Sequence, residues 1–296
     1  IEVTEHQSIH KRCTACGARN AGAFPEEAKN VVQYGPRIKA FMAYLRNYQL
    51  LPSERTRELL EVMTGMSVSE TVIAGASLSC FTELEMTEAN IKDALSEVRV
   101  CHFDETGMRV TGRLTWNHVA GNDRLTHYCL HAKRGQVAME DIGILPRFHG
   151  IAVHDGWKPY EGYAKSRHAL CNAHHLRELT FLEEEQGRRW AKKMKALLSV
   201  MKDASDEAKH KGETSMSDAD LKAFQRRYWI LLKQGFEEEA SMGQAGTEDG
   251  KKKRGRKKQT KGKNLLDRLS KHADAVLMFL HDLVVPFDNN QSERDL

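Results

Sequence analysis

Two aspartates of the chain, Asp104 and Asp155, occupy the same kind of place. Each closes a short β-prone segment and is followed at once by a turn that contains glycine. In α/β sheets, ligands bind outside the carboxyl ends of the strands, so two carboxylates there can converge on a cation. Shared hard oxygen ligands select Mg²⁺ or Mn²⁺. A lone aspartate at a strand end is usually a turn former, but the pair, with a third carboxylate available, predicts a metal site.

Glu293 is that third carboxylate, and its context allows two interpretations. Asn290 and Glu293 have the spacing of a capping box, which from this segment alone is the better explanation. A helix-borne glutamate that meets two strand-end aspartates is, however, the geometry of a two-metal phosphoryl-transfer site. Few residues follow Glu293 in the sequence. We therefore expect its segment to depend on Pro286, Phe287 and a cap at Asn289 and Asn290 for its position, and Glu293 to be mobile.

A second group of polar residues lies at a predicted strand-to-helix junction and comprises Cys171, His174, His175 and Arg177. Cys171 and His174 have the spacing of metal ligands, but a structural zinc site needs four ligands, and no second pair lies nearby in the sequence. Buried polar packing is the preferred interpretation. As an alternative, the two histidines and Arg177 could position a phosphate or DNA near the N-terminus of the helix.

Cys13 and Cys16 form a C-x-x-C pair near the start of the chain. Such a pair is half of a zinc ribbon, whose structural site needs four ligands. No second pair accompanies it, and His6 and His10 are poor substitutes. We therefore expect no more than a partial zinc knuckle here, in a zinc-ribbon-like remnant that spans residues 1–33.

The positive charge of the chain is concentrated in one strip. The 45 Lys+Arg and 41 Asp+Glu residues give a formal net charge of +4, yet nine basic residues and no acidic one lie within 251–263. The remainder of the chain is therefore mildly acidic. Such a strip is most often a solvated linker, but it can also follow the phosphates of a nucleic acid. The basic residues that we consider for this role are Lys251, Lys252, Lys253, Arg254, Arg256, Lys257 and Lys258.

The elements that would position these residues change type along the chain. Residues 34–97 have a helical pattern, in which Gly65 ends one helix and Ser67 or Ser69 can cap the next. A helix, a glycine turn and a capped helix have the local shape of a helix-turn-helix. Many small helical bundles share this shape, so both a DNA-reading unit and a plain bundle stay open.

The pattern then changes to strands, in the region 98–182 that would form the core. Three β-like segments, 98–103, 114–119 and 125–131, are separated by short turns and indicate an antiparallel meander. A short helix, two more strands and a long helix starting near His174 follow. This order predicts an α/β fold with a mixed sheet and flanking helices.

The last part of the chain is expected to be mostly helical. Residues 183–284 would form a helical insertion that contains a basic linker at 243–263. An amphipathic helix is predicted over 265–285, stopped by Pro286. Residues 285–296 would then begin the helix that carries the third carboxylate.

Composition excludes several classes of protein. A chain of 296 residues with 40% hydrophobic and 29% charged residues is typical of a globular protein with about two domains. The longest apolar run is far shorter than the ~20 residues that span a bilayer. No basic-then-apolar leader opens the sequence, and six cysteines in this length do not make a disulfide scaffold. We expect a cytoplasmic protein that is neither a membrane protein nor a small secreted domain.

Several blocks of the sequence, taken together and in order, resemble bacterial insertion-sequence transposases. The four main blocks lie at 102–107, 154–157, 170–179 and 288–296. The greatest similarity is to the insertion-sequence-66 family, whose helical segment before the catalytic domain is also similar to residues 33–39 and 48–52. The resemblance covers nearly the whole chain.

This resemblance implies an RNase H-like catalytic core of the DDE type, with its acidic triad on Asp104, Asp155 and Glu293. It implies a transposase that cleaves DNA and transfers strands with Mg²⁺ or Mn²⁺, as a homo-oligomer on transposon ends and target DNA. Two alternatives stay open: an RNase H-like nuclease without strand transfer, and a catalytically silent DNA-binding remnant. Family members have a second C-x-x-C pair and residues beyond the last block. We therefore expect a fragment truncated at both ends, in which zinc is doubtful.

Overall fold

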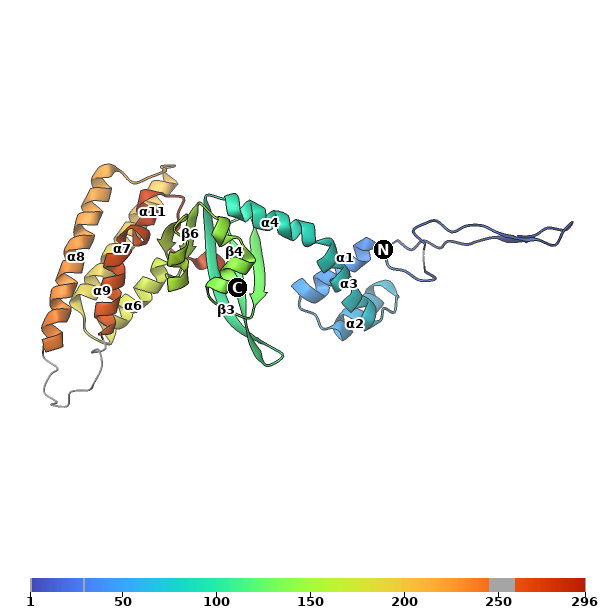
Figure 1. The fold of residues 1–296 in the computed structure, drawn as a ribbon, viewed down its shortest axis with the longest axis horizontal. Helices are drawn as coiled ribbons and strands as arrows, with labels where there is room; N and C mark the ends of the chain where they lie inside the picture. The colour runs from blue at the N-terminus through green and yellow to red at the C-terminus, as the bar shows by residue number, and fades with distance from the viewer. Residues whose placement is uncertain (1, 29, 245–258, 296) are drawn as a thin grey trace. The chain divides into compact units, whose positions relative to one another are not determined.

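The computed structural model of the chain describes residues 2–28, 30–244 and 259–295 (Figure 1). It divides into two compact units, Ile1–Glu88 and Ala89–Leu296. Each unit has apolar clusters of its own. The second unit carries the sheet and most of the predicted site residues.

The first unit consists of a hairpin and a small helical core. The hairpin pairs two short antiparallel strands, β1 (His10–Arg12) and β2 (Arg19–Ala21). The helices are α1 (Pro36–Ala43), which continues as a π-helical turn over Tyr44–Tyr48, α2 (Ser53–Thr64) and α3 (Glu70–Glu83). The buried core consists of Met42, Leu45, Leu60, Val68, Ile73 and Ala76.

The predicted glycine turn followed by a capped helix is present between α2 and α3. Gly65 ends α2 in the left-handed conformation, with a φ of +70°, which costs glycine little because it has no Cβ. Ser69 begins α3, and its hydroxyl accepts a hydrogen bond from the N–H of Val72. Of the two candidate caps, Ser69 is therefore the one that the structure uses.

The second unit is built on a mixed five-stranded sheet with the order β5-β4-β3-β6-β7. The strands are β3 (Val100–Val110), β4 (Arg113–Gly121), β5 (Thr126–His131), β6 (Ile151–His154) and β7 (Arg167–Leu170). The first three form an antiparallel meander, whereas β6 and β7 run parallel to β3. The predicted α/β class with a mixed sheet and flanking helices is confirmed.

Strand β3 is longer than the sequence indicated. We expected it to end at Asp104, with a turn that includes Gly107, but its antiparallel pairing with β4 continues to Val110 and the turn contains Gly112. The prediction was wrong because β4 satisfies the backbone groups of this exposed arm. The parallel pairing with β6 does end early, at His102. Asp104 therefore lies just past the parallel part of β3.

The alternation of side chains decides which way Asp104 faces. On β6, Ala152 packs into one apolar cluster and Val153 into another, so the two faces of the sheet have separate cores. On β3, Phe103 belongs to the same cluster as Ala152. Because successive side chains of a strand point to opposite faces, Asp104 points to the side of the Val153 cluster.

One face of the sheet is covered by short elements. They are the C-terminal part of α4 (Glu85–Glu97), α5 (Gln136–Ile142) and 3₁₀ turns at Leu145–Arg147 and Lys158–Gly162. Their buried side chains meet the strands in a cluster that contains Leu95, Cys101, Phe103, Met139, Phe148 and Tyr160. This core supports β3 from behind, on the side away from Asp104.

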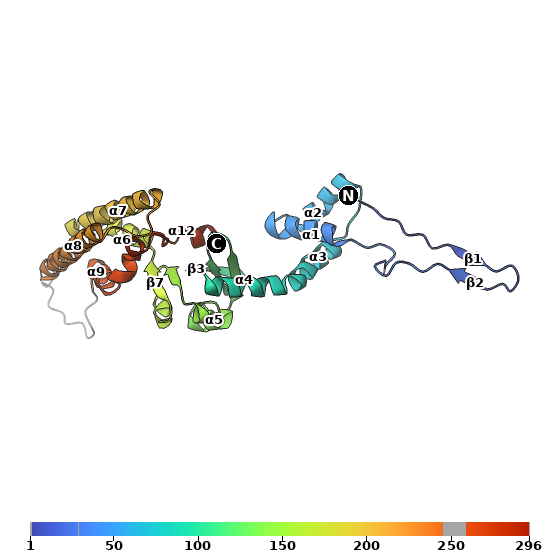
Figure 2. The same cartoon turned by 90° about the horizontal axis from the view of Figure 1, so that it is seen from above.

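The other side of the sheet carries longer helices that pack on one another: α6 (Asn172–Glu184), α7 (Arg189–His210), α8 (Asp218–Gln244) and α9 (Lys261–Lys271). Figures 1 and 2 show α7, α8 and α9 side by side. Val153 and Leu170 of the sheet share one cluster with Trp190, Tyr228 and Leu266 of these helices. These helices therefore extend the core of the sheet. None of the described helices is long and apolar enough to cross a membrane.

The helix predicted over 265–285 is broken into pieces. After α9, the chain forms the single turns α10 (Ala273–Val276) and α11 (Met278–His281). Backbone φ values of −111° at His272 and −97° at Leu277 interrupt the helical path. The breaks allow nearly every apolar side chain of this stretch to be buried, which one straight helix with an exposed face cannot do. The helix therefore ends well before Pro286.

Candidate active site

Asp104 and Asp155 lie at the same level of the sheet. Each is two residues beyond the last parallel pair of β3 and β6, His102 and Val153. Asp104 is half-buried, and its Oδ1 accepts a hydrogen bond of 2.8 Å from the N–H of Glu105. The expected placement of two carboxylates on neighbouring strands therefore follows from the parallel register.

A tight turn holds Asp155 at the end of β6. Its Oδ1 accepts a hydrogen bond of 2.7 Å from the N–H of Trp157. Gly156 between them has a φ of +86°, a conformation that side chains with a Cβ rarely adopt. The N–H of Gly156 also donates to Nδ1 of His154 at 3.0 Å. Asp155 is thus both a turn former and a carboxylate at the strand end.

Glu293 lies on a short helix, α12 (Asn290–Asp295), that packs on β3 and β4. The end of this helix is attached to β5 through Asp295. Its carboxylate accepts a hydrogen bond of 3.0 Å from the hydroxyl of Thr126, and its carbonyl accepts one of 2.5 Å from the hydroxyl of Tyr128. These contacts anchor α12 to the sheet, while the mobility of Glu293 stays a prediction.

The start of α12 is held by Asn289, which is buried. Its Nδ2 donates to the carbonyl of Phe103 at 3.0 Å, and its Oδ1 lies 2.8 Å from Nδ1 of His102. The capping box expected for Asn290 and Glu293 is replaced by this arrangement, because the helix begins one residue after Asn289 and the Glu293 carboxylate contacts an arginine instead. Asn289 therefore connects the helix to both residues that precede Asp104.

The three carboxylates are close enough to influence one another. Burial raises the pKa of Asp104, and the negative charges of Asp155 and Glu293 raise it further, against the opposing effect of the hydrogen bond from Glu105. His174 acts in the opposite direction and lowers the pKa of Asp104. Asp104 therefore lies within electrostatic reach of both partners and of a histidine.

Arg177 of α6 forms an ion pair with Glu293 of α12. Its Nη2 lies 3.2 Å from Oε1 of Glu293. The Arg177 side chain is 63% exposed and that of Glu293 is 38% exposed, so the ion pair is open to solvent and weak. Of the predicted phosphate-positioning residues, Arg177 is the one whose side chain is exposed to solvent beside Glu293.

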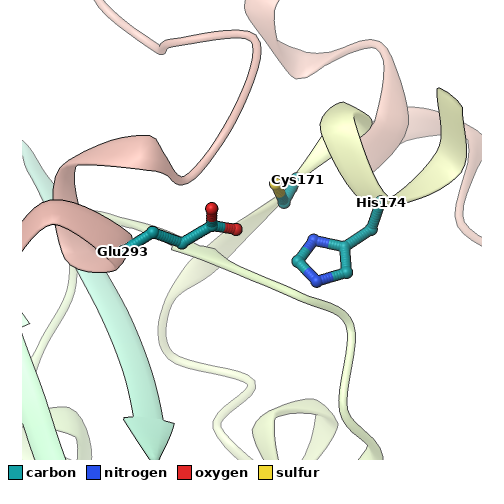
Figure 3. Close-up of side chains that lie close together, drawn as sticks. All are labelled: Cys171, His174 and Glu293. Carbon is teal, nitrogen blue, oxygen red and sulfur yellow. The ribbon is translucent and has the colours of Figure 1, made fainter. Parts of the chain in front are cut away.

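Glu293 also approaches a cysteine and a histidine at the start of α6. One ligand atom each from Cys171, His174 and Glu293 lie within 4.8 Å of one another. Figure 3 shows the Glu293 carboxylate directed toward the other two side chains. Sequence reasoning paired Cys171 with His174 but missed Glu293 as their neighbour, because Glu293 is far away in the chain and only the packing of α12 brings it there.

The chain matches a known family over most of its length. A model of the family described as "Transposase IS66 family" matches residues 31–296. The chain belongs to this family. No curated protein matches the sequence. The matched part of this IS66-family transposase contains every predicted site residue except the pair Cys13 and Cys16.

His175 of this IS66-family transposase does not lie on the solvent-exposed side of the site, where Arg177 and Glu293 are. Its side chain is buried, and its Nδ1 lies 3.1 Å from Oδ1 of Asn172. Burial, assisted by the nearby charges of Arg268 and His174, lowers the pKa of His175 to about 3. This placement argues against the predicted phosphate contact, because a buried neutral imidazole attracts no anion.

A buried network behind the aspartates escaped sequence reasoning. The Glu105 carboxylate accepts a hydrogen bond of 2.6 Å from the hydroxyl of Tyr160 and pairs with Arg134 at 2.8 Å. The Arg134 guanidinium lies over the rings of Trp157 and Trp116, at 4.0 and 5.0 Å. Burial raises the pKa of Glu105 to about 7 despite these partners. The position of Glu105 directly after Asp104 was the available signal.

The remaining predicted residues lie elsewhere. Lys251, Lys252, Lys253, Arg254, Arg256, Lys257 and Lys258 are outside the described residues. Cys13 and Cys16 are exposed in the first unit of this IS66-family transposase. Hydrogen bonds from the backbone of Cys16 and Ala15 and from the Cys16 side chain lower the pKa of Cys13, which favours the thiolate that a metal would need.

Proposed function

We propose that this protein is a DDE transposase that cleaves DNA and transfers the cut strand by metal-dependent phosphoryl transfer. Asp104, Asp155 and Glu293 would be the metal ligands. The observation that carries this proposal is the parallel register of β3 and β6, which places Asp104 and Asp155 at the same level of neighbouring strands, with Glu293 on the helix that packs on β3 and β4. Membership of a transposase family supports the same chemistry.

The donor set fits Mg²⁺ or Mn²⁺. All three groups are carboxylates, the hard oxygen ligands that these ions prefer. Three negative charges around a half-buried position repel one another, and a divalent cation relieves that repulsion. When bound, the ions would supply activation of the attacking hydroxyl and stabilisation of the leaving oxygen.

The order of strands in the sheet supports an RNase H-like core. Three antiparallel strands in chain order are followed by two that run parallel to the first, and the first strand is central. Asp104 is on this central strand and Asp155 ends its parallel neighbour. Glu293 comes from a helix that packs on β3 and β4. Three elements thus supply one carboxylate each.

Side chains on the solvent-exposed side of the three carboxylates would position the DNA. Arg177 is exposed beside Glu293, so its guanidinium can form two parallel hydrogen bonds with a phosphate. His174 lies close enough to Asp104 to affect the pKa of that residue. The hydroxyl of water or of a DNA end serves as the nucleophile, so the proposal needs no nucleophilic side chain of the protein.

Two assays test the proposal with the same protein. One measures nicking of supercoiled plasmid with Mg²⁺ or Mn²⁺, and the other measures joining of a labelled oligonucleotide with a free 3′-hydroxyl to that plasmid. We expect both activities in the native chain and neither in Asp104→Asn, Asp155→Asn or Glu293→Gln. Asp123→Asn, in an exposed turn, is the matched control and should keep both.

The outcomes separate the alternatives. Cutting without joining would identify a nuclease that lacks strand transfer. Binding of DNA with no cutting in either metal would identify a silent DNA-binding protein. Undiminished nicking by Asp104→Asn would overturn the assignment of the three carboxylates.

A further inference from the structure

The group formed by Cys171, His174 and Glu293 has the ligand types of a zinc site. Zn²⁺ binds thiolate, imidazole and carboxylate ligands at distances of about 2.0–2.3 Å, which places ligand atoms of a tetrahedral site roughly 3.5 Å apart. In this protein the three ligand atoms already lie within 4.8 Å of one another. A shift of about an ångström in the exposed Glu293 side chain would close that difference.

Two of the ligands are held in place without the metal. Cys171 is buried, and its Sγ accepts a hydrogen bond of 3.2 Å from the N–H of Asn289. His174 is one turn further along α6, and its Nδ1 is buried with no hydrogen-bond partner in the part of the chain that the structure describes. A buried imidazole nitrogen without a partner is costly, and a metal ion beside it would remove that cost.

The third ligand is easy to recruit. Glu293 is paired with Arg177, and both side chains reach the solvent, at 38% and 63% exposure. Exposed ion pairs of this kind contribute little to stability. A divalent cation can therefore displace Arg177 from Glu293 at little cost. With three protein ligands, the fourth position of a tetrahedral ion would stay open for water or a phosphate oxygen.

The chemistry of the site separates it from the site of the three carboxylates. A thiolate and an imidazole suit Zn²⁺ and are poor ligands for Mg²⁺. Glu293 is common to both groups, and its carboxylate is directed toward Cys171 and His174 (Figure 3). An ion held by these two residues would keep Glu293 on their side, away from the two aspartates.

We propose that Cys171, His174 and Glu293 bind Zn²⁺, and that bound Zn²⁺ withdraws Glu293 from Asp104 and Asp155. Zinc would thereby antagonise the Mg²⁺-dependent reaction. The existence of the site is independent of the proposed function, whereas the antagonism depends on it. The two parts therefore need separate measurements.

Binding is tested with Co²⁺, which replaces Zn²⁺ and gives a thiolate-to-cobalt absorption band and strong visible bands in tetrahedral sites. The experiment uses the full chain with Cys13→Ser and Cys16→Ser, because that exposed pair could bind the probe as well. We expect about one equivalent of Co²⁺ to produce both bands and Zn²⁺ to remove them. Mg²⁺ at millimolar concentration should leave them unchanged.

Variants show which residues bind. Cys171→Ser keeps an acceptor for the N–H of Asn289 and should lose the thiolate band. His174→Ala removes an imidazole nitrogen that has no partner, so it should fold normally and bind Co²⁺ more than about tenfold more weakly. Replacing residues that only support a ligand already costs 10–100-fold. Cys80→Ser, on α3, is the control and should keep the spectrum. A thiolate band that persists in Cys171→Ser would overturn the site.

Antagonism is then measured as nicking with Mg²⁺ in the presence of rising Zn²⁺. Inhibition that Cys171→Ser relieves would support the second part of the proposal, and equal inhibition of this variant would overturn it. If the native chain does not nick DNA with Mg²⁺ alone, the proposed function fails while the Co²⁺ spectrum still decides the zinc site. Arg177→Gln should bind Co²⁺ at least as tightly as the parent protein, and weaker binding would contradict the competition described for Glu293.

Discussion

The fold opposes the ionisation of Asp104. Burial raises its pKa, and Asp155 and Glu293 add to the effect. A carboxyl group whose pKa is higher in the folded than in the unfolded state lowers stability once it is ionised, above its unfolded pKa. At neutral pH, without metal, the charge of Asp104 therefore destabilises the folded protein. A bound cation would reverse that effect.

The first prediction concerns Asp104→Asn. Without metal the variant should unfold at the same temperature as the native chain or higher, because the opposed charge is gone. Adding Mn²⁺ should raise the melting temperature of the native chain and leave that of the variant unchanged. An ion at 100 times its Kd adds about 2.7 kcal/mol to the stability. Thermal unfolding with and without EDTA measures both effects, with Asp123→Asn as the control. An equal rise in all three proteins would place the ion elsewhere.

At the scale of the element, helix α12 shows how a very short helix is held in place. Six residues form too little of a helix to be stable alone. Asn289 supplies hydrogen bonds to β3 at one end, and Asp295 accepts hydrogen bonds from β5 at the other. The sequence pattern named both asparagines and favoured Asn290 as the capping residue, whereas in the structure Asn289 makes the hydrogen bonds that anchor the helix.

This difference gives the second prediction. Asn289→Ala leaves the carbonyl of Phe103 and the ring of His102 without their partner, which should cost about 1–3 kcal/mol. It should also reduce metal-dependent nicking, because Glu293 loses its support. Asn290→Ala, at an exposed neighbouring position, should change both little. Denaturant unfolding and the plasmid assay measure the two effects. If Asn290→Ala proves the more harmful variant, the capping box is the correct interpretation.

Among the long helices, Glu239 of α8 makes hydrogen bonds to residues at the starts of α7 and α9. Its carboxylate accepts hydrogen bonds from Arg188 at 2.7 Å, from the indole of Trp190 at 3.3 Å and from the hydroxyl of Thr260 at 2.7 Å. Burial opposes its ionisation, but these donors prevail and lower the pKa of Glu239. A Cβ at Gly262 would lie 2.2 Å from this carboxylate, so the glycine there makes room for it.

The third prediction follows from that lowered pKa. Glu239→Gln should lower the free energy of unfolding at pH 7 by about 1–3 kcal/mol, because Arg188 loses its charged partner. A carboxylate whose pKa is lower in the folded than in the unfolded state stabilises the fold at pH values above its unfolded pKa of about 4.3. This contribution to stability disappears as the pH falls through the pKa of the folded state. The difference between the two proteins should therefore shrink in acid. Urea unfolding at several pH values measures this difference in the free energy of unfolding, with exposed Glu237→Gln as the control. A difference that stays constant with pH would contradict the prediction.

At the scale of the whole molecule, charge is distributed unevenly. Nine of the basic residues lie within 251–263 of a chain with a net charge of only +4. Of the described members, Lys263 is already paired with Asp267 at 2.7 Å, and Lys261 lies over the ring of Phe181. The seven others are the residues proposed to contact DNA phosphates.

The fourth prediction tests this strip. Replacing those seven basic residues by Ser or Gln should weaken DNA binding and make it less dependent on salt. Each lost phosphate contact should reduce the log–log salt slope by about 0.9. Fluorescence anisotropy with labelled duplex at several salt concentrations measures the slope. Neutralising Lys202 and Lys211, which pair with Asp206 and Glu207 of α7, is the control. An unchanged slope in the strip variant would mean that the strip is a solvated linker.

The sequence was sufficient for some parts of the molecule and insufficient for others. Strand periodicity and turns predicted the meander, because its three strands follow one another along the chain, and the order of strands and helices predicted the mixed sheet. The end of β3 and the breaks between α9, α10 and α11 were not predictable, because β4 and the shared core decide them. The proximity of Cys171 and Glu293 depends in the same way on packing between distant segments.

The attachment of α12 to β3 has a consequence for the protein while it is being made. The hydrogen-bonded pair of His102 and Asn289 joins residues 187 positions apart. At about 5–20 residues per second, roughly ten to forty seconds separate their emergence from the ribosome. From the emergence of Asp155 until that of Glu293, the nascent chain carries both aspartates without the glutamate. Under the proposed function, an unfinished chain cannot cut the DNA from which its own message is being copied.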